Sequence, residues 1–315
     1  MLSDGRRLHM HDGPIDLIVE AFGGAAEIRT AYLAATERFV NVLDELCGEL
    51  PLLRSPVCES SPIPSGKVAR RMVAAVRPYS AQIFITPMAA VAGAVAEDIL
   101  AVMTNAARLS RAYVNDGGDI AFHLTEGEHF TIGMLGLPDI FRPAQSHDIH
   151  RNERNTASVS GEMFGSTVIE YAQPIRGIAT SGWRGRSFSL GIADAVTVLA
   201  DTAAMADAAA TVIANAVDLP GHDGIRRVPA SELAPDSDLG ELLVTQSVAR
   251  LDPCDICAAL NSGARTARTL VDEGLIRAAA LHLQGETQVI GSELIHTLNS
   301  TLNSDVTLKR SLANA

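Results

Sequence analysis

The chain has 315 residues, a length that suits one large domain. Hydrophobic residues make up 47% of it and charged residues 20%, which excludes a disordered or fibrous protein. The net charge of −12 argues against the basic surface that nucleic acid or an anionic membrane would require. We therefore expect no nucleic-acid partner and no membrane partner.

The N-terminal residues contain no apolar run typical of a signal peptide. The two most apolar stretches, residues 87–106 and 195–217, both carry acidic residues in their interior, which is unfavourable for a membrane span. We therefore expect a soluble, cytoplasmic protein. The C-x-x-C motif of Cys254 and Cys257 fits either two positions on one helical turn or a redox pair.

In the first half of the chain, alternating apolar residues predict a strand at 15–23, and helical spacing predicts a helix from 25 to about 50, ended by Pro51. A Pro/Ser-rich connector follows. The next predicted elements are a short helix or strand at 67–76, a strand at 82–87, a small-residue helix at 88–107 and a strand–turn–strand at 111–124.

In the second half, a polar loop is predicted at 138–157, and a Gly-rich turn with a buried strand at 176–200. Helices are predicted at 202–217 and 254–274, a last strand at 275–285, and a polar tail of uncertain order from about 291. No linker divides the chain, so we expect a single domain over residues 1–315, as one body or two intertwined lobes. Its fold class is α+β (layered α/β), with a mainly antiparallel sheet packed against helices. Such a sheet and its small-residue helices are compatible with a homo-oligomer.

The segment VNDGGDI, residues 114–120, is a strong turn signal between two strands. Its glycines, Gly117 and Gly118, could present backbone N–H groups to an anion, with Asp119 at the mouth of the turn. A plain hairpin turn explains the same residues.

The segment GIATSGWRGRSFS, residues 177–189, combines hydroxyls, glycines and two arginines in an acidic protein. This pattern suits a phosphate or carboxylate site. Thr180, Ser181, Gly182 and Arg184 are its candidate ligand-binding residues, and Arg186 adds a second positive charge. A solvated loop whose arginines pair with surface acids is the alternative.

Asp207 and Thr211 are four residues apart on a predicted helix and therefore lie on the same face. A carboxylate and a hydroxyl suit a hard cation such as Mg²⁺. An aspartate among alanines also needs a partner if it is buried. A polar stripe that faces solvent is the simpler interpretation of this spacing.

Taken in order, VNDGGDI, GIATSG and VTVLADTAAMADAAAT resemble the ApbE superfamily, the Mg²⁺-dependent FAD:protein FMN transferases. Over residues 9–290 the chain more closely resembles a smaller, uncharacterised prokaryotic family of ApbE-like proteins. The segments GPIDLIVEAFG, TPMAAVAGAVAEDI and GIATSGWRGRSFSLGIADAVTVLA carry this second resemblance.

The resemblance implies that the metal site falls on Asp207 and Thr211. It places a nucleotide-contacting turn on Gly117, Gly118 and Asp119, and the Thr-Ser-Gly segment on residues 180–182. The chain departs from the transferases at two points. The run AAVAGAVAED has no lysine, and SLGIADAVTV has neither histidine nor proline. The cation site is therefore expected to persist, whereas FAD is a doubtful ligand.

The leading hypothesis is an ApbE-like enzyme, a Mg²⁺-dependent transferase or hydrolase that acts on a small anionic or phosphorylated molecule or nucleotide. Arg184 and the Gly117–Gly118 turn would orient the anion, and Asp119 or Asp194 would act as a base. One alternative is transfer of FMN from FAD to a protein threonine. Another is a flavin- or metabolite-binding protein without catalysis.

Overall fold

The computed structural model describes residues 1–135, 163–291 and 294–297. The loop predicted at 138–157 and most of the predicted C-terminal tail lie outside these ranges.

The fold is organised around an eight-stranded sheet in which every neighbouring pair of strands is antiparallel. Alternation of buried and exposed residues is clear at its N-terminal edge, where Ile15, Leu17 and Val19 face the core. The α+β class with a mainly antiparallel sheet is thus confirmed. In sheet order, the strands are β1 (Leu8–Asp12), β2 (Ile15–Gly23), β3 (Leu109–Asp116), β4 (Asp119–Leu124), β7 (Gly177–Ser181), β8 (Ala195–Ala200), β11 (Ala278–Leu283) and β12 (Glu286–Ile290).

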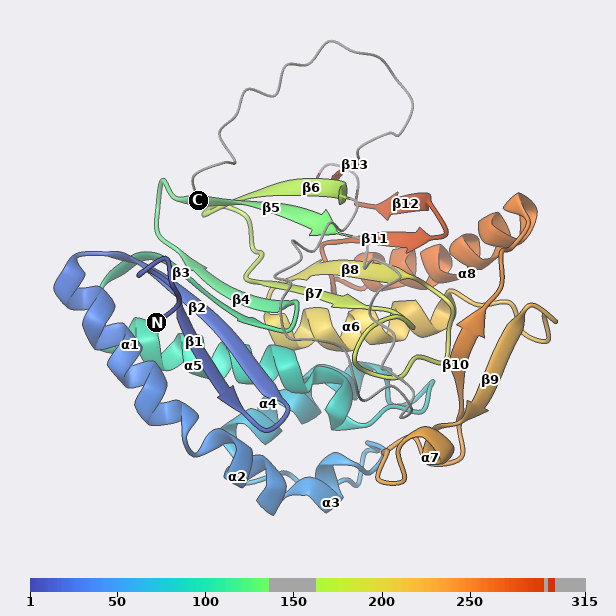
Figure 1. Cartoon of the computed structure of the whole chain (residues 1–315), viewed down its shortest axis with the longest axis horizontal. Coiled ribbons are helices and arrows are strands. Elements are labelled where there is room, and N and C mark those ends of the chain that lie inside the picture. Colours follow the sequence, from blue (N-terminus) through green and yellow to red (C-terminus); the bar gives the residue numbers. More distant parts are fainter. Residues whose placement is uncertain (136–162, 292–293, 298–315) are drawn as a thin grey trace, which may run out of the picture.

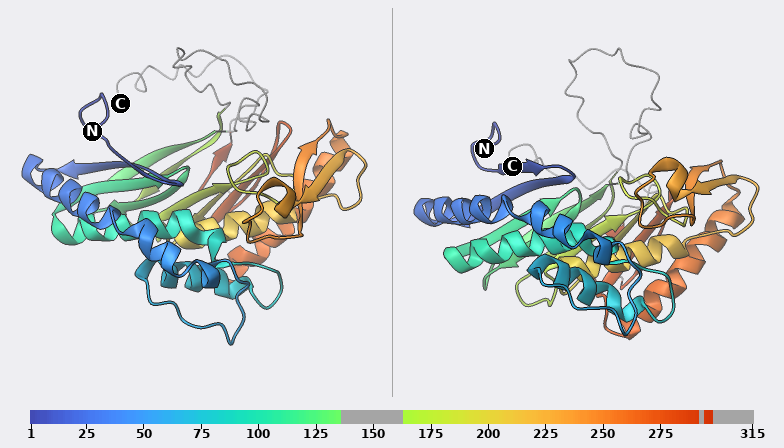
Figure 2. Two further views of the ribbon diagram at one scale, coloured as in Figure 1. Left: turned by 60° about the horizontal axis from the view of Figure 1, so that its bottom comes forward. Right: turned by 90° about the horizontal axis from the view of Figure 1, so that it is seen from below.

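Helices cover one face of this sheet, as Figures 1 and 2 show from three directions. Helix α6 packs on β7 and β8 and against α5, and its alanines allow this close approach because they add little bulk. Thr202 caps its N-terminus by accepting a hydrogen bond from the Met205 N–H at 3.3 Å. The helices are α1 (Ala25–Phe39), α2 (Val42–Gly48), α3 (Leu50–Leu53), α4 (Lys67–Val76), α5 (Val91–Ala106), α6 (Ala203–Ala216), α7 (Ala230–Leu233) and α8 (Pro253–Asp272).

A smaller sheet covers part of the opposite face (Figure 1). It has the order β13–β6–β5, with β5 (His129–Leu135), β6 (Met163–Glu170) and β13 (His296–Thr297). Phe130 and Ile169 of this sheet pack with Phe122 and Leu199 of the large sheet in a second hydrophobic core. A separate two-stranded sheet of β9 (Ile225–Pro229) and β10 (Leu243–Val248) lies beside α7, at the opposite end of the molecule from α1 (Figure 1).

The helical stretch Pro87–Ala106, which contains α5, is long and apolar enough to cross a membrane by length and composition. More than half of its most apolar window is buried inside the fold, between the large sheet and the neighbouring helices. Its acidic residue Asp98 is buried and pairs with Arg38 at 2.6 Å and Arg71 at 2.5 Å.

Several predicted elements differ from the structure. The helix expected at 25–50 is divided into α1, α2 and the start of α3, and Pro51 lies in the first turn of α3, where its missing N–H costs no hydrogen bond. Residues 82–87 form no strand, although the segment is apolar. Ile83 and Phe84 are exposed, and the Ile85 carbonyl accepts a hydrogen bond from Val57 in the connector.

The segment 176–200 contains two strands, β7 and β8, where a single buried strand was predicted. The strand predicted at 275–285 is β11, but it is not the last, because β12 and β13 follow it.

Candidate functional site

One end of the large sheet brings together the three segments that the sequence singled out. Because neighbouring strands are antiparallel, the end of β3, the start of β4, the end of β7 and the start of β8 lie at the same edge. Helix α6 crosses beneath this edge and contributes Asp207 from its second turn.

The β3–β4 turn is a tight hairpin, as one interpretation of VNDGGDI predicted. Asp116 pairs with Asp119 across it, and Gly117 and Gly118 have φ values of +64° and +117°, a region that favours glycine. The Gly118 N–H already donates to Asn115 Oδ1 at 2.8 Å. That N–H is therefore engaged within the turn.

Asp119 joins this turn to the Thr-Ser-Gly segment. Its Oδ1 accepts a hydrogen bond from the Thr180 N–H at 3.1 Å. The Thr180 hydroxyl is 2.9 Å from that of Thr197 on β8, which fixes its orientation. Ser181 ends β7, and Gly182 follows in contact with backbone, since a Cβ built on it would lie 2.5 Å from Asp194 O.

Asp207 is half-buried at the interface of α6 and α5. Its Oδ2 accepts a hydrogen bond from the Gly93 N–H at 3.0 Å. Asn215 lies two turns further along the same face of α6. Its side-chain oxygen also accepts a backbone hydrogen bond, from the Leu190 N–H at 2.9 Å. Thr211 lies between these two residues on that face. The alternative of a stripe directed only at solvent is therefore wrong for both Asp207 and Asn215.

The carboxylates of this edge affect one another electrostatically. Burial raises the pKa of Asp119 to about 7, and the charge of Asp116 adds to the effect. Burial also raises the pKa of Asp207 well above its usual range, and the charges of Asp119 and Asp116 add to it. Burial likewise raises the pKa of Asp116 to about 6, opposed by the Asp16 N–H and by Arg186. All three carboxyl groups at this edge of the sheet thus hold their protons to higher pH than exposed aspartates do.

These pKa shifts predict how stability depends on pH. A carboxyl whose pKa is raised by folding binds more protons in the folded than in the unfolded chain, so its contribution to stability is lost as pH rises through the folded pKa. In EDTA, the free energy of unfolding is expected to fall between pH 5 and pH 8. Urea unfolding at these pH values measures it, and the fall should shrink in Asp119→Asn. An equal fall in that variant would contradict the prediction.

The donor set suits a hard cation in its chemistry. Asp207 and Thr211 offer carboxylate and hydroxyl oxygens on one helix face, and the Asp119 carboxylate is near enough for its charge to act on Asp207. Within the described residues, however, no group of three or more His, Cys, Asp or Glu side chains is arranged to hold a metal ion. A cation here would thus have one or two carboxylates and keep several waters, as Mg²⁺ commonly does.

The two arginines of the β7–β8 loop have different positions. Arg184 Nε donates to Asp194 Oδ1 at 2.7 Å, and its guanidinium stacks near the Trp183 ring. Arg186 instead reaches the β3–β4 turn, with Nη2 3.6 Å from Asp116 Oδ1. The sequence analysis chose Arg184 as the anion-binding residue and gave Arg186 only as a second positive charge, but it is Arg186 that lies beside the Asp116 carboxylate.

Asp194, a predicted base, has a buried carboxylate with several partners. Besides Arg184, its oxygens accept hydrogen bonds from the Trp183 indole at 3.1 Å and from the Gln284 N–H at 2.6 Å. These bonds fit a residue that positions the β7–β8 loop.

Outside this group, His222 and the two cysteines of the C-x-x-C motif have other surroundings. His222 accepts a bond from the Gly224 N–H at Nδ1, so the proton is assigned to Nε2, which faces Asp255 at 3.2 Å. Cys254 and Cys257 are exposed free thiols on the first turns of α8.

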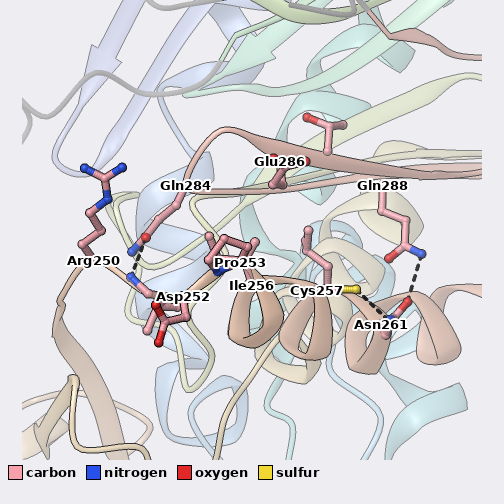
Figure 3. Close-up of a pocket in the computed structure, with 12 residues that line it drawn as sticks. Arg250, Asp252, Pro253, Ile256, Cys257, Asn261, Gln284, Glu286 and Gln288 are labelled. Carbon is pink, nitrogen blue, oxygen red and sulfur yellow. Dashed lines mark hydrogen bonds between the residues drawn. The ribbon is translucent and has the colours of Figure 1, made fainter.

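A cavity of about 890 Å³ lies between the N-terminal half of α8 and the β11–β12 hairpin. Figure 3 shows Gln284 at one end of it and Gln288 with Asn261 at the other. The side chain of Gln284 binds the Leu251 N–H at 2.9 Å, while its own N–H bonds Asp194. The cavity is thus joined through Asp194 to the β7–β8 loop, although none of the predicted site residues lines it.

Comparison with known proteins identifies a family model for most of the chain and relatives that match about half of it. The family model described as "AbpE bacteria" matches residues 1–289. A UPF0280 protein of Methanococcoides burtonii is 34% identical over 160 residues, 50% of this chain and 55% of that protein. A UPF0280 protein of Methanothermobacter thermautotrophicus is 33% identical over 138 residues, 43% of this chain and 44% of that protein. The matches thus span about half the length of these relatives.

Among solved structures, the apo form of the flavinyl transferase ApbE of Pseudomonas stutzeri aligns with a TM-score of 0.42 and 10% identity, over 93% of this chain and 94% of that one. The flavin transferase ApbE of Vibrio cholerae aligns with a TM-score of 0.38 and 10% identity, over 91% and 98%. The match of the family model from residue 1 to residue 289 decides the assignment, and the chain belongs to the AbpE bacteria family, an ApbE-like family.

Proposed function

We propose that this protein is a divalent-cation-dependent enzyme, a transferase or hydrolase, that acts on a small anionic or phosphorylated ligand. The observation that supports the proposal is the approach of Asp119 and Asp207. They come from a hairpin turn and a helix far apart in sequence, and the negative charge of Asp119 adds to the burial that raises the pKa of Asp207. Two such carboxylates at one sheet edge favour binding of a cation, and perturbed acids often mark functional sites.

Asp207 and Thr211 would hold the cation, with Asp119 opposite. A bound Mg²⁺ would supply Lewis-acid polarisation of a phosphoryl or carbonyl oxygen. The protein's own residues would do the rest. The Thr180 N–H orients Asp119, which accepts a proton from the attacking group, and the arginines of the β7–β8 loop bind the anionic part of the ligand. Asp194 holds Arg184 and Trp183 in place.

Transfer of FMN from FAD to a protein threonine is a second candidate. It is favoured by the meeting of the three ApbE-like motifs at one place, through the bond of Asp119 to Thr180 and the interaction of Asp119 with Asp207. In that reaction the threonine oxygen bonds to the FMN phosphorus, the pyrophosphate bond breaks, AMP leaves, and the hydroxyl proton passes to a base.

The test is an incubation of the purified protein with FAD and Mg²⁺, followed by separation of the nucleotides. Parallel incubations use small phosphorylated and carboxylated metabolites, with EDTA as the control. Release of AMP would support FMN transfer, and Mg²⁺-dependent turnover of another compound would support the broader proposal. Ligand binding without turnover of any compound would favour a non-catalytic binding protein and overturn both.

A further inference from the structure

Arg186 lies directly against the β3–β4 turn. A Cβ built on Gly117 would lie 1.8 Å from Arg186 Nη2, so glycine at this position leaves the space that the guanidinium occupies. From there the guanidinium is 3.6 Å from Asp116 Oδ1. This distance indicates an ion pair without a well-formed hydrogen bond.

The two partners of this ion pair differ in burial. The Asp116 side chain is 5% exposed, whereas that of Arg186 is 61% exposed. The arginine therefore reaches a buried carboxylate from the solvent side, with most of its own side chain exposed. The positive charge of Arg186 also lowers the pKa of Asp119 and so opposes the effect of burial. Arg184, two residues earlier, is tied to Asp194 by a short hydrogen bond.

We propose that Arg186 is the exchangeable counter-charge of the site: it neutralises Asp116 and Asp119 in the cation-free protein, and it binds the anionic group of the ligand once a divalent cation is present. The inference rests on the proposed function and names a residue for its anion-binding step. Asp116, which Arg186 contacts, and Asp119 both act on Asp207 through their negative charges, so a cation held by Asp207 and the guanidinium of Arg186 repel each other while both are stabilised by the same group of carboxylates, and they compete. When the cation is bound, the guanidinium is released toward an anion at the mouth of the turn, for which its planar fork of donors is suited.

This competition predicts effects of opposite sign in Arg186→Gln. Mn²⁺ alone, followed by electron paramagnetic resonance, should bind roughly three- to tenfold more tightly, because a neighbouring positive charge is removed. Inorganic pyrophosphate, measured by equilibrium dialysis at saturating Mg²⁺, should bind about tenfold more weakly or worse, because a charge-assisted contact is lost. Arg186→Lys should keep the Mn²⁺ affinity near that of the wild type and recover pyrophosphate binding only in part.

Arg226→Gln is the matched control, since Arg226 is an exposed arginine on β9. It should change neither affinity. Arg186→Gln that binds Mn²⁺ with unchanged or weaker affinity would overturn the role of Arg186 alone. Failure of the wild-type protein to bind Mn²⁺ at all would overturn the cation site of the proposed function and this role with it. Thermal melting of each variant confirms that it is folded, which the exposure of the Arg186 side chain favours.

Discussion

Asp207→Asn is expected to abolish divalent-cation binding and to stabilise the cation-free protein at the same time. Asparagine keeps the oxygen that accepts the Gly93 N–H, so the contact between α5 and α6 remains. It removes a buried negative charge whose pKa is raised by burial and by Asp119. The cost of keeping that charge inside the fold at pH 8 disappears with it.

We expect the dissociation constant for Mn²⁺ to rise about 100-fold or more, in the range typical of lost ligands or their supports. Urea unfolding in EDTA at pH 8 should show a gain of about 1–2 kcal/mol, a normal size for one substitution. At pH 5 the gain should be smaller, because the raised pKa of Asp207 makes its carboxyl in the wild type take up more protons at pH 5 than at pH 8.

Asp201→Asn is the matched control for this variant. Asp201 lies just before α6 and pairs with Arg277 through both oxygens, at 2.6 and 2.7 Å. The Asp201→Asn substitution should leave Mn²⁺ binding unchanged. It should lower the free energy of unfolding only slightly, because the ion pair with Arg277 is partly exposed. If Asp207→Asn bound Mn²⁺ like the wild type, Asp207 would not be a ligand of the cation. If the variant were less stable than the wild type at pH 8, the charge of Asp207 would not be unfavourable in the folded protein.

The separate parts of the candidate site could be predicted because each has a recognisable local sequence pattern. Asn-Asp-Gly-Gly predicts a tight hairpin, and the turn places Asp119 at the sheet edge. The i, i+4 spacing predicts that Asp207 and Thr211 share a helix face. That these residues meet was implied by the resemblance to the ApbE superfamily, and in the structure the Thr180 N–H bonds Asp119 and so joins two of the segments.

The choice between Arg184 and Arg186 could not be made from the sequence. Both arginines stand in one irregular loop, where no periodicity fixes the direction of a side chain. The path of the loop is set by Gly182, which approaches the Asp194 backbone, and by the bonds that Asp194 makes to Trp183 and Gln284. Gln284 is 90 residues from Asp194 in sequence, so no local sequence pattern could predict this contact.

Strand prediction failed where tertiary contacts override local preference. Residues 82–87 are apolar enough for a strand, but they run along the connector and expose Ile83 and Phe84. Conversely, β9 and β10 contain arginines, serine and glutamine, and their pairing with each other stabilises them without strong apolar alternation. Helices α5, α6 and α8 were predicted well because their spacing is a local property of the chain, whereas the single helix expected at 25–50 is divided into three.

Gly93→Ala is expected to produce the largest loss of stability of the substitutions considered. Gly93 lies near the start of α5, where α6 begins against it. A Cβ at this position would lie 2.3 Å from Ala203 O, 2.5 Å from Ala203 C and 2.7 Å from Ala204 N. All three are backbone atoms at the start of α6, so the two helices must separate to admit one methyl group.

The separation would also lengthen the hydrogen bond from the Gly93 N–H to Asp207. We expect a loss of about 3 kcal/mol or more, a size reserved for overpacking against rigid neighbours, together with weaker Mn²⁺ binding in whatever protein remains folded. Circular-dichroism melting and urea unfolding measure the loss. Gly48→Ala is the matched control, because Gly48 is also a helical glycine but a Cβ there meets no atom within 4 Å. That variant should be neutral or stabilised by roughly 0.5–1 kcal/mol, since alanine favours the helix. Equal melting of the two variants would mean that α5 and α6 are not in the backbone contact that positions Asp207.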